Sequence, residues 1–179
     1  MMRRLLALVV ATVGLAVAGC TGSPAPANPT KIRVVPVAER EAAPALAGDL
    51  LDGTPFDPAS VAGDVVVVNF WGSWCAPCVA EADDLEGTYQ ATRDGGVSFV
   101  GVNVKDTQAA ATSFAQGRST YPSIFDPSSR LVLGFAVPPT AIPSTVIIDR
   151  QGRVAMMVNA AVVRDELQSV VEQIAAEPS

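Results

Sequence analysis

The feature that most constrains this chain is the pair Cys75 and Cys78, which stands between an apolar run and a helical pattern. The run over residues 65–71, Val-Val-Val-Val-Asn-Phe-Trp, is typical of a buried strand, so Cys75 lies where a strand passes into a helix. Unpaired N–H groups and the positive end of the helix dipole favour a thiolate there, which makes Cys75 the expected nucleophile. Cys78 lies three residues further on, within reach of a disulfide with Cys75, and is expected to be the resolving cysteine.

Two cysteines at this spacing could also form half of a structural zinc site, which needs four ligands. The chain has no histidine and three cysteines in all, and the third, Cys20, belongs to an N-terminal leader. The remaining ligands would have to be carboxylates. The sequence therefore favours a redox-active dithiol over a metal site, and neither a metal nor a cofactor is expected.

Residues 1–19 have the pattern of a lipoprotein signal peptide. A basic start precedes an apolar stretch over residues 5–18, which is too short to span a bilayer comfortably. Val17-Ala18-Gly19-Cys20 resembles the lipobox of bacterial lipoproteins, in which the chain is cut before the cysteine and the thiol receives lipid. An ordinary cleaved signal with a chance cysteine is the alternative. Lipidation at Cys20 predicts a protein held on the extracytoplasmic face of the bacterial cell membrane.

Residues 20–43 are expected to form a flexible membrane tether, and residues 44–179 a single domain. The first part of the tether is rich in proline and small residues, and no apolar period appears before about Leu46. An early strand over residues 31–37 is the alternative for the end of this segment. The remaining residues suffice for one domain with a hydrophobic core.

The charge of the chain argues against nucleic acid as a partner. The chain has 12 basic and 18 acidic residues and a net charge of −6. The charged residues of the leader are all basic, so its loss would make the net charge more negative. The sequence contains no basic cluster or interleaved aromatic stripe that would hold phosphate.

Segments of strand and helix type alternate along the rest of the chain. The patterns predict strands at 65–70, 97–104, 144–149 and 153–159, helices at 76–93, 107–116, 128–134 and 164–176, and a hairpin at 50–56. Asp149-Arg150-Gln151-Gly152 is the expected turn between the last two strands. This order predicts an α/β fold with a mixed central sheet flanked by helices.

The sequence resembles the thioredoxin superfamily and, within it, the TlpA/ResA-like membrane-anchored thiol-disulfide oxidoreductases of bacteria. The likeness covers roughly residues 43–174. It rests on Asn69-Phe70-Trp71-Gly72-Ser73-Trp74-Cys75-Ala76-Pro77-Cys78, on Glu81 and Leu85, and on Ile142-Pro143-Ser144-Thr145-Val146-Ile147-Ile148-Asp149 with its Gly152 turn. The resemblance implies a thioredoxin fold with an N-terminal β-hairpin extension and a central insertion at about residues 105–134.

The resemblance also implies a substrate-binding surface. Pro143 would be a cis-proline beside the dithiol, presenting the backbone of Ile142 to a bound peptide, and a trans loop proline is the alternative. Trp74 would be a partly exposed lid on the site, with a core-packed tryptophan as the alternative. Ala76 and Pro77, which separate the two cysteines, complete the expected surface.

Glu81 matches the acidic residue that family members carry beneath the dithiol. Three residues beyond Cys78, it lies on the same side of the helix and one turn below, where a carboxylate can take the proton of Cys78. A solvated glutamate on the helix surface is the alternative. Asn69 stands where thioredoxins usually have a buried aspartate as proton acceptor, and because an amide cannot accept that proton, the role would pass to Glu81. Asp83 departs from the family, which often has a helix-kinking proline there.

The expected function is thiol-disulfide exchange on extracytoplasmic proteins, in which Cys75 attacks a disulfide and Cys78 resolves the mixed disulfide. The resemblance favours reduction, for example of apocytochrome c during cytochrome c biogenesis, with electrons from a membrane-embedded thiol relay. Oxidation of secreted protein thiols is the alternative within redox chemistry. A copper chaperone of this fold would need a histidine and a wider cysteine spacing, and related peroxidases have a threonine where this chain has Gly72.

Overall fold

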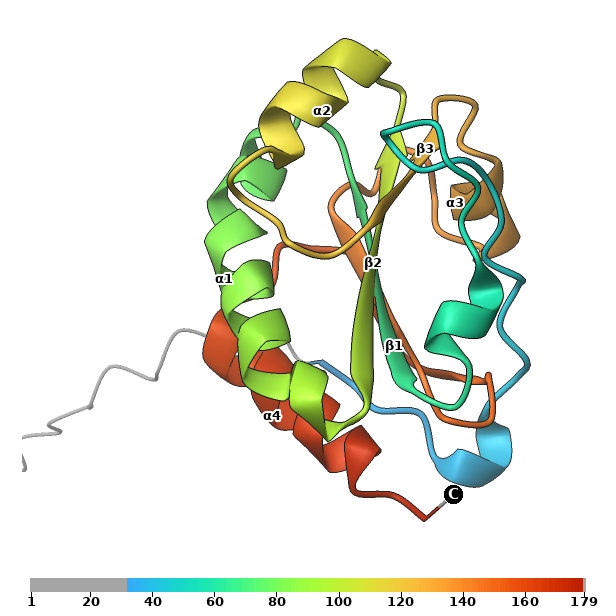
Figure 1. Cartoon of the computed structure of the whole chain (residues 1–179). Helices are drawn as coiled ribbons and strands as arrows, with labels where there is room; N and C mark the ends of the chain where they lie inside the picture. The colour runs from blue at the N-terminus through green and yellow to red at the C-terminus, as the bar shows by residue number, and fades with distance from the viewer. Residues whose placement is uncertain (1–31, 179) are drawn as a thin grey trace, which may run out of the picture.

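A five-stranded mixed sheet forms the centre of the structure, a computed structural model that describes residues 32–178 (Figure 1). In spatial order its strands are β3 (Ser123–Asp126), β2 (Val97–Val104), β1 (Val65–Trp71), β4 (Ser144–Ile148) and β5 (Val154–Val158). The first three run parallel to one another, whereas β4 and β5 pair antiparallel with their neighbours. This arrangement confirms the predicted α/β class with a mixed central sheet.

Helices cover both faces of the sheet. On one face α1 (Ala76–Thr92) and α4 (Arg164–Ala175) pack against each other, and on the other face lies the short helix α3 (Arg130–Gly134) (Figure 1). Helix α2 (Gln108–Ala115) follows the carboxyl end of β2. One-turn 3₁₀ helices lie at Val37–Glu39, Pro58–Val61 and Arg93–Gly95.

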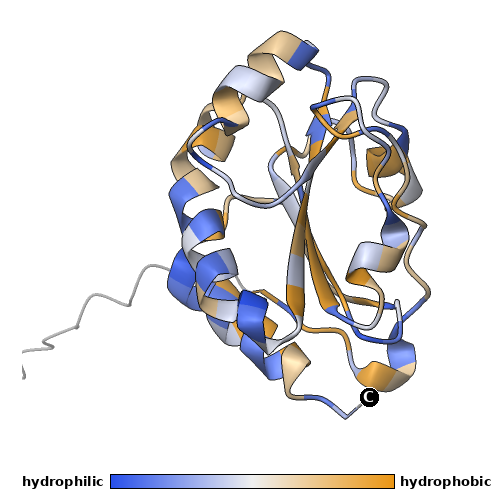
Figure 2. Ribbon diagram, viewed as in Figure 1, coloured by the Kyte–Doolittle hydropathy of each residue, from blue (hydrophilic) through white to orange (hydrophobic). Residues whose placement is uncertain are grey.

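Strand β1 is buried along its whole length because it lies at the centre of the sheet. Val65 and Val67 belong to the hydrophobic core beneath α1 and α4, and Val66, Val68 and Phe70 to the core on the opposite face. A strand covered on both faces needs a continuous apolar run rather than an alternating one. Figure 2 shows this pattern, with hydrophobic strands inside and hydrophilic residues on the outer helices.

The expected strands and helices agree with the observed bounds to within two residues, apart from β3, which was not expected. Strand β3 has only two apolar residues, so no period-2 pattern marks it. Its backbone pairs with residues 101–104 of β2, which supply the partners that make it a strand. The expected hairpin at 50–56 is a tight turn, in which the Leu50 N–H donates to the Thr54 carbonyl at 2.7 Å.

Residues 32–43, which the sequence assigned to the tether, pack on the domain instead. Val34 forms a β-bridge with Met156, and Ala42 forms one with Arg153. The edge of β5 offers these backbone partners, and a sequence pattern does not show them. The folded part of the chain therefore includes this segment, through isolated bridges rather than through the early strand that was the alternative.

The expected signal peptide (1–19), the lipidation site Cys20 and the first part of the tether lie outside the described residues. Within residues 32–178, no helix is both long and apolar enough to cross a membrane. In the same described range, no cluster of three or more His, Cys, Asp or Glu side chains could hold a metal ion.

Candidate functional site

Cys75 and Cys78 form a disulfide at the start of α1, with their Cα atoms 5.2 Å apart. Both residues are buried, with exposed fractions of 3% and 2%. Cys75 is the N-cap residue of the helix, and its sulfur accepts a hydrogen bond from the backbone N–H of Cys78, with 3.2 Å between nitrogen and sulfur. Since β1 ends just before this turn, the expected passage from strand to helix places Cys75 at the positive end of the helix dipole.

Glu81 lies buried in α1, one turn below the disulfide, with an exposed fraction of 1%. Its Oε1 accepts a hydrogen bond from Asn69 Nδ2 at 2.9 Å, and its Oε2 accepts one from the Val162 N–H at 2.9 Å. Burial raises the pKa of Glu81 to about 7, although both hydrogen bonds favour the ionised form. Glu81 is therefore not a solvated surface residue, and its carboxyl group can exchange a proton near neutral pH.

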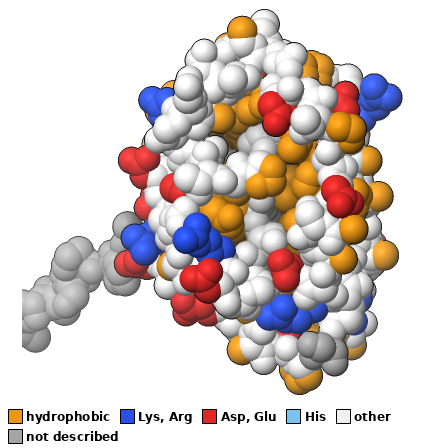
Figure 3. Space-filling model, viewed as in Figure 1, with side chains coloured by type: hydrophobic (Ala, Val, Ile, Leu, Met, Phe, Trp, Pro, Cys, Tyr) orange, Lys and Arg blue, Asp and Glu red, His pale blue; other side chains and the backbone are white. Residues whose placement is uncertain are grey.

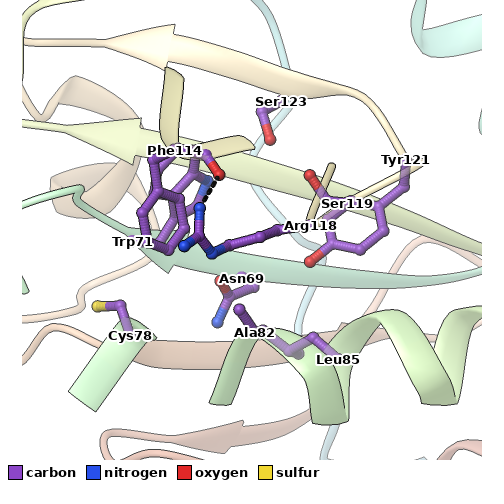
Figure 4. Close-up of a pocket in the computed structure, with 10 residues that line it drawn as sticks. All are labelled: Asn69, Trp71, Cys78, Ala82, Leu85, Phe114, Arg118, Ser119, Tyr121 and Ser123. Atoms are coloured by element: carbon purple, nitrogen blue, oxygen red, sulfur yellow. Dashed lines mark hydrogen bonds between the residues drawn. The ribbon is translucent and has the colours of Figure 1, made fainter. Parts of the chain in front are cut away.

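Asn69 connects Glu81 to a cavity of about 20 Å³ beside Cys78. Figure 4 shows Cys78 and Asn69 on the side of this cavity next to α1, with Phe114 and Arg118 on the opposite side. The Arg118 guanidinium lies 4.9 Å from the centre of the Phe114 ring and donates a hydrogen bond to the Phe114 carbonyl at 3.1 Å. A cavity of this size has room for about one water molecule.

A wider groove of about 550 Å³ lies next to this cavity. It runs between the turn at residues 50–52, the end of α2 and residues 119–123, and the cavity and the groove share Ser119, Tyr121 and Ser123. Figure 3 shows hydrophobic side chains along the hollow on this face of the molecule. The resolving cysteine is thus buried from bulk solvent but borders an internal space that both polar and apolar side chains line.

Trp74 stands exposed next to the disulfide, with an exposed fraction of 53%. Its indole N–H donates to the Val104 carbonyl at 3.2 Å, so the ring is attached at one point to the end of β2. A core-packed tryptophan is therefore the wrong alternative. Ala76 and Pro77, the first two residues of α1, are also exposed, so the residues on both sides of Cys75 in the chain lie at the surface.

The Ile142–Pro143 peptide bond is cis, as expected from the resemblance. Ile142 is partly buried and packs against the cluster that contains Trp71, Cys75 and Cys78. Pro143 itself is buried, so the exposed part of this loop is formed by the residues before it. This loop is distant from the cysteines in the sequence, but the structure places it beside the disulfide.

Asp106 is a residue near the site that the sequence analysis did not single out. Its carboxylate accepts hydrogen bonds from the Ser73 N–H at 2.7 Å and the Ser73 hydroxyl at 3.0 Å, two residues before Cys75. Its position in the sequence, just beyond the predicted strand at 97–104, could have indicated this role. Strands β1 and β2 are adjacent and parallel, so the residues that follow their carboxyl ends lie close together.

Comparisons with known proteins agree with this geometry. The family described as Redoxin matches residues 38–174. Thiol-disulfide oxidoreductase ResA of Geobacillus thermodenitrificans is 27% identical over 125 residues, which cover 69% of this chain and 71% of the relative. Thiol:disulfide interchange protein HelX of Rhodobacter capsulatus is 33% identical over 125 residues, 68% of each chain. The crystal structure of a secreted thiol-disulfide isomerase from Corynebacterium glutamicum superposes with a TM-score of 0.77 at 30% identity, covering 86% of this chain and 96% of that one.

Proposed function

This chain belongs to the redoxin family and is a thiol-disulfide oxidoreductase, and on that premise we propose that it reduces disulfides of extracytoplasmic proteins. The observation that carries the reductive direction is the carboxyl group of Glu81, buried beneath the dithiol with its pKa raised to about 7. In its ionised form, this carboxyl group opposes the formation of a thiolate nearby. The reduced form of the Cys75–Cys78 couple is therefore less stable relative to the disulfide. A dithiol that is easily oxidised gives its electrons to other disulfides.

The proposed reaction begins with the reduced protein. The Cys75 thiolate attacks one sulfur of a substrate disulfide, which forms a mixed disulfide and releases the other substrate sulfur as a thiolate. Glu81 then accepts the proton of Cys78, directly or through the cavity beside Asn69, and the Cys78 thiolate attacks the sulfur of Cys75. The Cys75–Cys78 disulfide forms and the second substrate thiol leaves, so the substrate gains the two electrons that the dithiol loses.

The substrate-binding surface that we propose consists of the residues that surround the mouth of the dithiol. Trp74, Ala76 and Pro77 are exposed on the side of α1, and Ile142 lies against the disulfide on the other side. The backbone next to the cis-proline Pro143 would pair with an extended substrate segment, which brings a disulfide in that segment to Cys75.

The location that we propose is the extracytoplasmic face of the cell membrane, with a lipid anchor at Cys20. The lipobox-like sequence before Cys20 supports it, and one similar structure is named a secreted protein. Electrons would then come from a membrane-embedded thiol relay, and apocytochrome c is a proposed substrate. Cys20→Ala should leave a folded, redox-active protein that is no longer retained in the membrane fraction. An unmodified Cys20 thiol in the mature wild-type protein, detected by mass spectrometry, would contradict the anchor.

The direction of the reaction is tested by the equilibrium potential of the Cys75–Cys78 couple, measured against defined glutathione or dithiothreitol buffers. For a reductant we expect a value near that of thioredoxin, about −270 mV, and for an oxidant one near that of DsbA, about −120 mV. The name of one similar structure, a secreted thiol-disulfide isomerase, does not specify net reduction, so oxidation of secreted thiols is the second candidate. A potential well above the thioredoxin value would favour that candidate.

The roles of the two cysteines are tested by trapping. Cys78→Ser should accumulate mixed disulfides with substrate through Cys75, because the nucleophile remains while the resolving thiol is absent. Cys75→Ser is the matched control and should trap nothing, since Cys78 lies inside the first turn of α1 rather than at its N-cap, where the helix favours a thiolate. Trapping that requires Cys78 and survives Cys75→Ser would reverse the assignment. Non-reducing gel electrophoresis with mass spectrometry of the adducts gives the readout.

A further inference from the structure

The loop that leads into the nucleophile, residues 72–74, is attached to a single turn of the neighbouring strand. This turn, residues 104–107, begins at the last residue of β2 and ends just before α2. The Trp74 indole donates to the Val104 carbonyl, and Ser73 donates twice to Asp106. Both residues before Cys75 are therefore held by side-chain or backbone groups of that turn.

Asp106 is the centre of this attachment. Its Oδ2 accepts from the Ser73 N–H at 2.7 Å and from Asn103 Nδ2 at 3.0 Å. Its Oδ1 accepts from the Ser73 hydroxyl at 3.0 Å and from the Thr107 N–H at 2.9 Å. Although burial opposes ionisation, the hydrogen bonds from Asn103, Ser73 and Thr107 lower the pKa of Asp106 below its usual value, so the carboxylate stays ionised at neutral pH.

The turn itself also reaches a second segment near the site. Lys105 has a positive φ of 50°, a conformation that few non-glycine residues adopt, and its Nζ donates to the Pro139 carbonyl at 3.2 Å. The same turn thus contacts the loop before Cys75 and the segment that leads to the cis-proline. Gly72 adds a further constraint, because a Cβ there would lie 2.5 Å from the indole nitrogen of Trp74.

We propose that Asp106 is a positioning residue for the nucleophile: by holding Ser73 it keeps the sulfur of Cys75 at the N-terminus of α1 when the disulfide is open. In the disulfide form, the bond to Cys78 also restrains Cys75. In the dithiol and mixed-disulfide forms that bond is absent, and the loop then restrains the nucleophile together with the hydrogen bond from the Val79 N–H to the Cys75 carbonyl. The inference rests on Cys75 being the attacking thiol.

Position and charge predict opposite results when Asp106 is replaced. If Asp106 acted only through its negative charge, neutralising it would favour the thiolate, lower the pKa of Cys75 and speed its attack. If it acts by position, loosening the loop moves the sulfur away from the helix N–H groups, which raises the pKa of Cys75 and slows the attack. The sign of the change therefore separates the two explanations.

The experiment measures the first attack alone, in the full chain with Cys78→Ser. The rate of mixed-disulfide formation with oxidised glutathione is followed by mass spectrometry across a pH range, which gives both the rate constant and the pKa of Cys75. Asp106→Asn should raise this pKa and slow the attack at neutral pH by about tenfold, since small displacements of reacting groups are costly. Asp106→Glu keeps the charge but displaces it by one methylene, and should change both quantities in the same direction.

Asp57→Asn is the matched control, because Asp57 Oδ1 accepts a hydrogen bond from the Ala59 N–H at 2.9 Å in a similar way at the start of a 3₁₀ helix. It should leave the rate and the pKa unchanged. An Asp106→Glu protein with wild-type kinetics, or an Asp106→Asn protein with a lowered Cys75 pKa, would overturn the positioning role.

Folding of the variants and reactivity of the parent have outcomes of their own. If the Asp106 variants fail to fold, Ser73→Ala removes only the hydroxyl contact and should slow the attack by about threefold, and an unchanged rate there would overturn the inference. Failure of the Cys78→Ser parent to form any mixed disulfide would overturn the role of Cys75 and the inference with it. A reactive parent with unchanged Asp106 variants overturns the inference alone.

Discussion

At the scale of single residues, one buried carboxyl group determines the acid–base chemistry of this site. The chain has no histidine, the residue that ordinarily titrates near neutral pH. Glu81 takes this place because burial raises its pKa from 4.5 to about 7. Its two hydrogen bonds, from Asn69 and the Val162 N–H, hold the carboxyl group in one orientation in the disulfide form.

Glu81→Gln should alter the pH dependence of stability in the oxidised protein. The raised pKa means that the contribution of Glu81 to stability is fully present below pH 4.5 and is lost as the pH rises through 7. The wild-type free energy of unfolding should therefore fall between about pH 5 and pH 8, by about 3 kcal/mol at most, and the glutamine variant should lose this fall. Urea unfolding at a series of pH values measures it.

Glu86→Gln is the control for this prediction. Glu86 lies on the same helix, but hydrogen bonds from Thr120 and Gln90 outweigh the effect of burial and lower its pKa. Its replacement should leave the decline in stability around neutral pH in place. An identical pH dependence in wild type and Glu81→Gln would show that the carboxyl group titrates in the ordinary acidic range.

At the scale of elements, a glycine in β2 allows its neighbours β1 and β3 to pack closely beside the site. Gly101 of β2 lies between the Trp71 indole of β1 and Ser123 of β3. The Trp71 ring in turn packs on Phe114 of α2, with 5.0 Å between ring centres. Because Gly101 has no side chain, the Trp71 ring can pack beside Cys78. The contact between Trp71 and Phe114 then holds α2 against the sheet.

Gly101→Ala should destabilise the protein by about 1–3 kcal/mol, because its Cβ would contact Ser123 Oγ and lie 2.8 Å from Trp71 Nε1. The displaced indole should also change the intrinsic tryptophan fluorescence of the folded state. Gly95→Ala is the matched control, since a Cβ there meets no atom within 4 Å, and it should be close to neutral. Equal thermal midpoints for the two variants would contradict this account of the packing.

At the scale of the whole molecule, Arg40 joins the two ends of the described chain. Its side chain is 1% exposed, and it pairs with Asp149 at 3.1 Å and with both carboxylate oxygens of Glu177. Asp149 follows β4, and Glu177 follows α4. Residues 32–43 and the C-terminal end of the described chain are therefore attached to the same end of the sheet.

Arg40→Met should lower the free energy of unfolding by about 3 kcal/mol, because the loss of one member of a buried ion pair leaves the other charge inadequately paired. Asp149 would keep the Arg153 guanidinium, which lies 2.8 Å away, and the hydrogen bonds from the backbone N–H groups of Gln151 and Arg153. Limited proteolysis should then cleave within residues 32–43 faster than in wild type. Arg130→Met serves as the control, because Arg130 is exposed and, among residues 32–178, its side chain donates only to a serine hydroxyl. An Arg40→Met protein as stable and as protease-resistant as this control would contradict the proposed attachment.

The local pattern of residues was sufficient to predict most elements and the dithiol. Hydrophobic periodicity and helix-start signals depend on neighbours in the sequence, so the strand before Cys75 and the helix after it could be placed to within one residue. The resemblance placed Pro143 and Glu81, because the motifs around them occur in a known fold. Strand β3 was missed, since its few apolar residues form a strand only through pairing with β2.

Short-range patterns in the chain predict the order of strands and helices and identify the two redox cysteines. The pKa of Glu81 follows from the folded structure instead, because it depends on burial and on hydrogen bonds from segments 12 and 81 residues away. The same holds for Asp106, which reaches Ser73 across 33 residues, and for Arg40, which reaches Glu177 across 137. These contacts arise when the chain packs around the sheet, and their energies depend on distance and burial in space rather than on sequence separation.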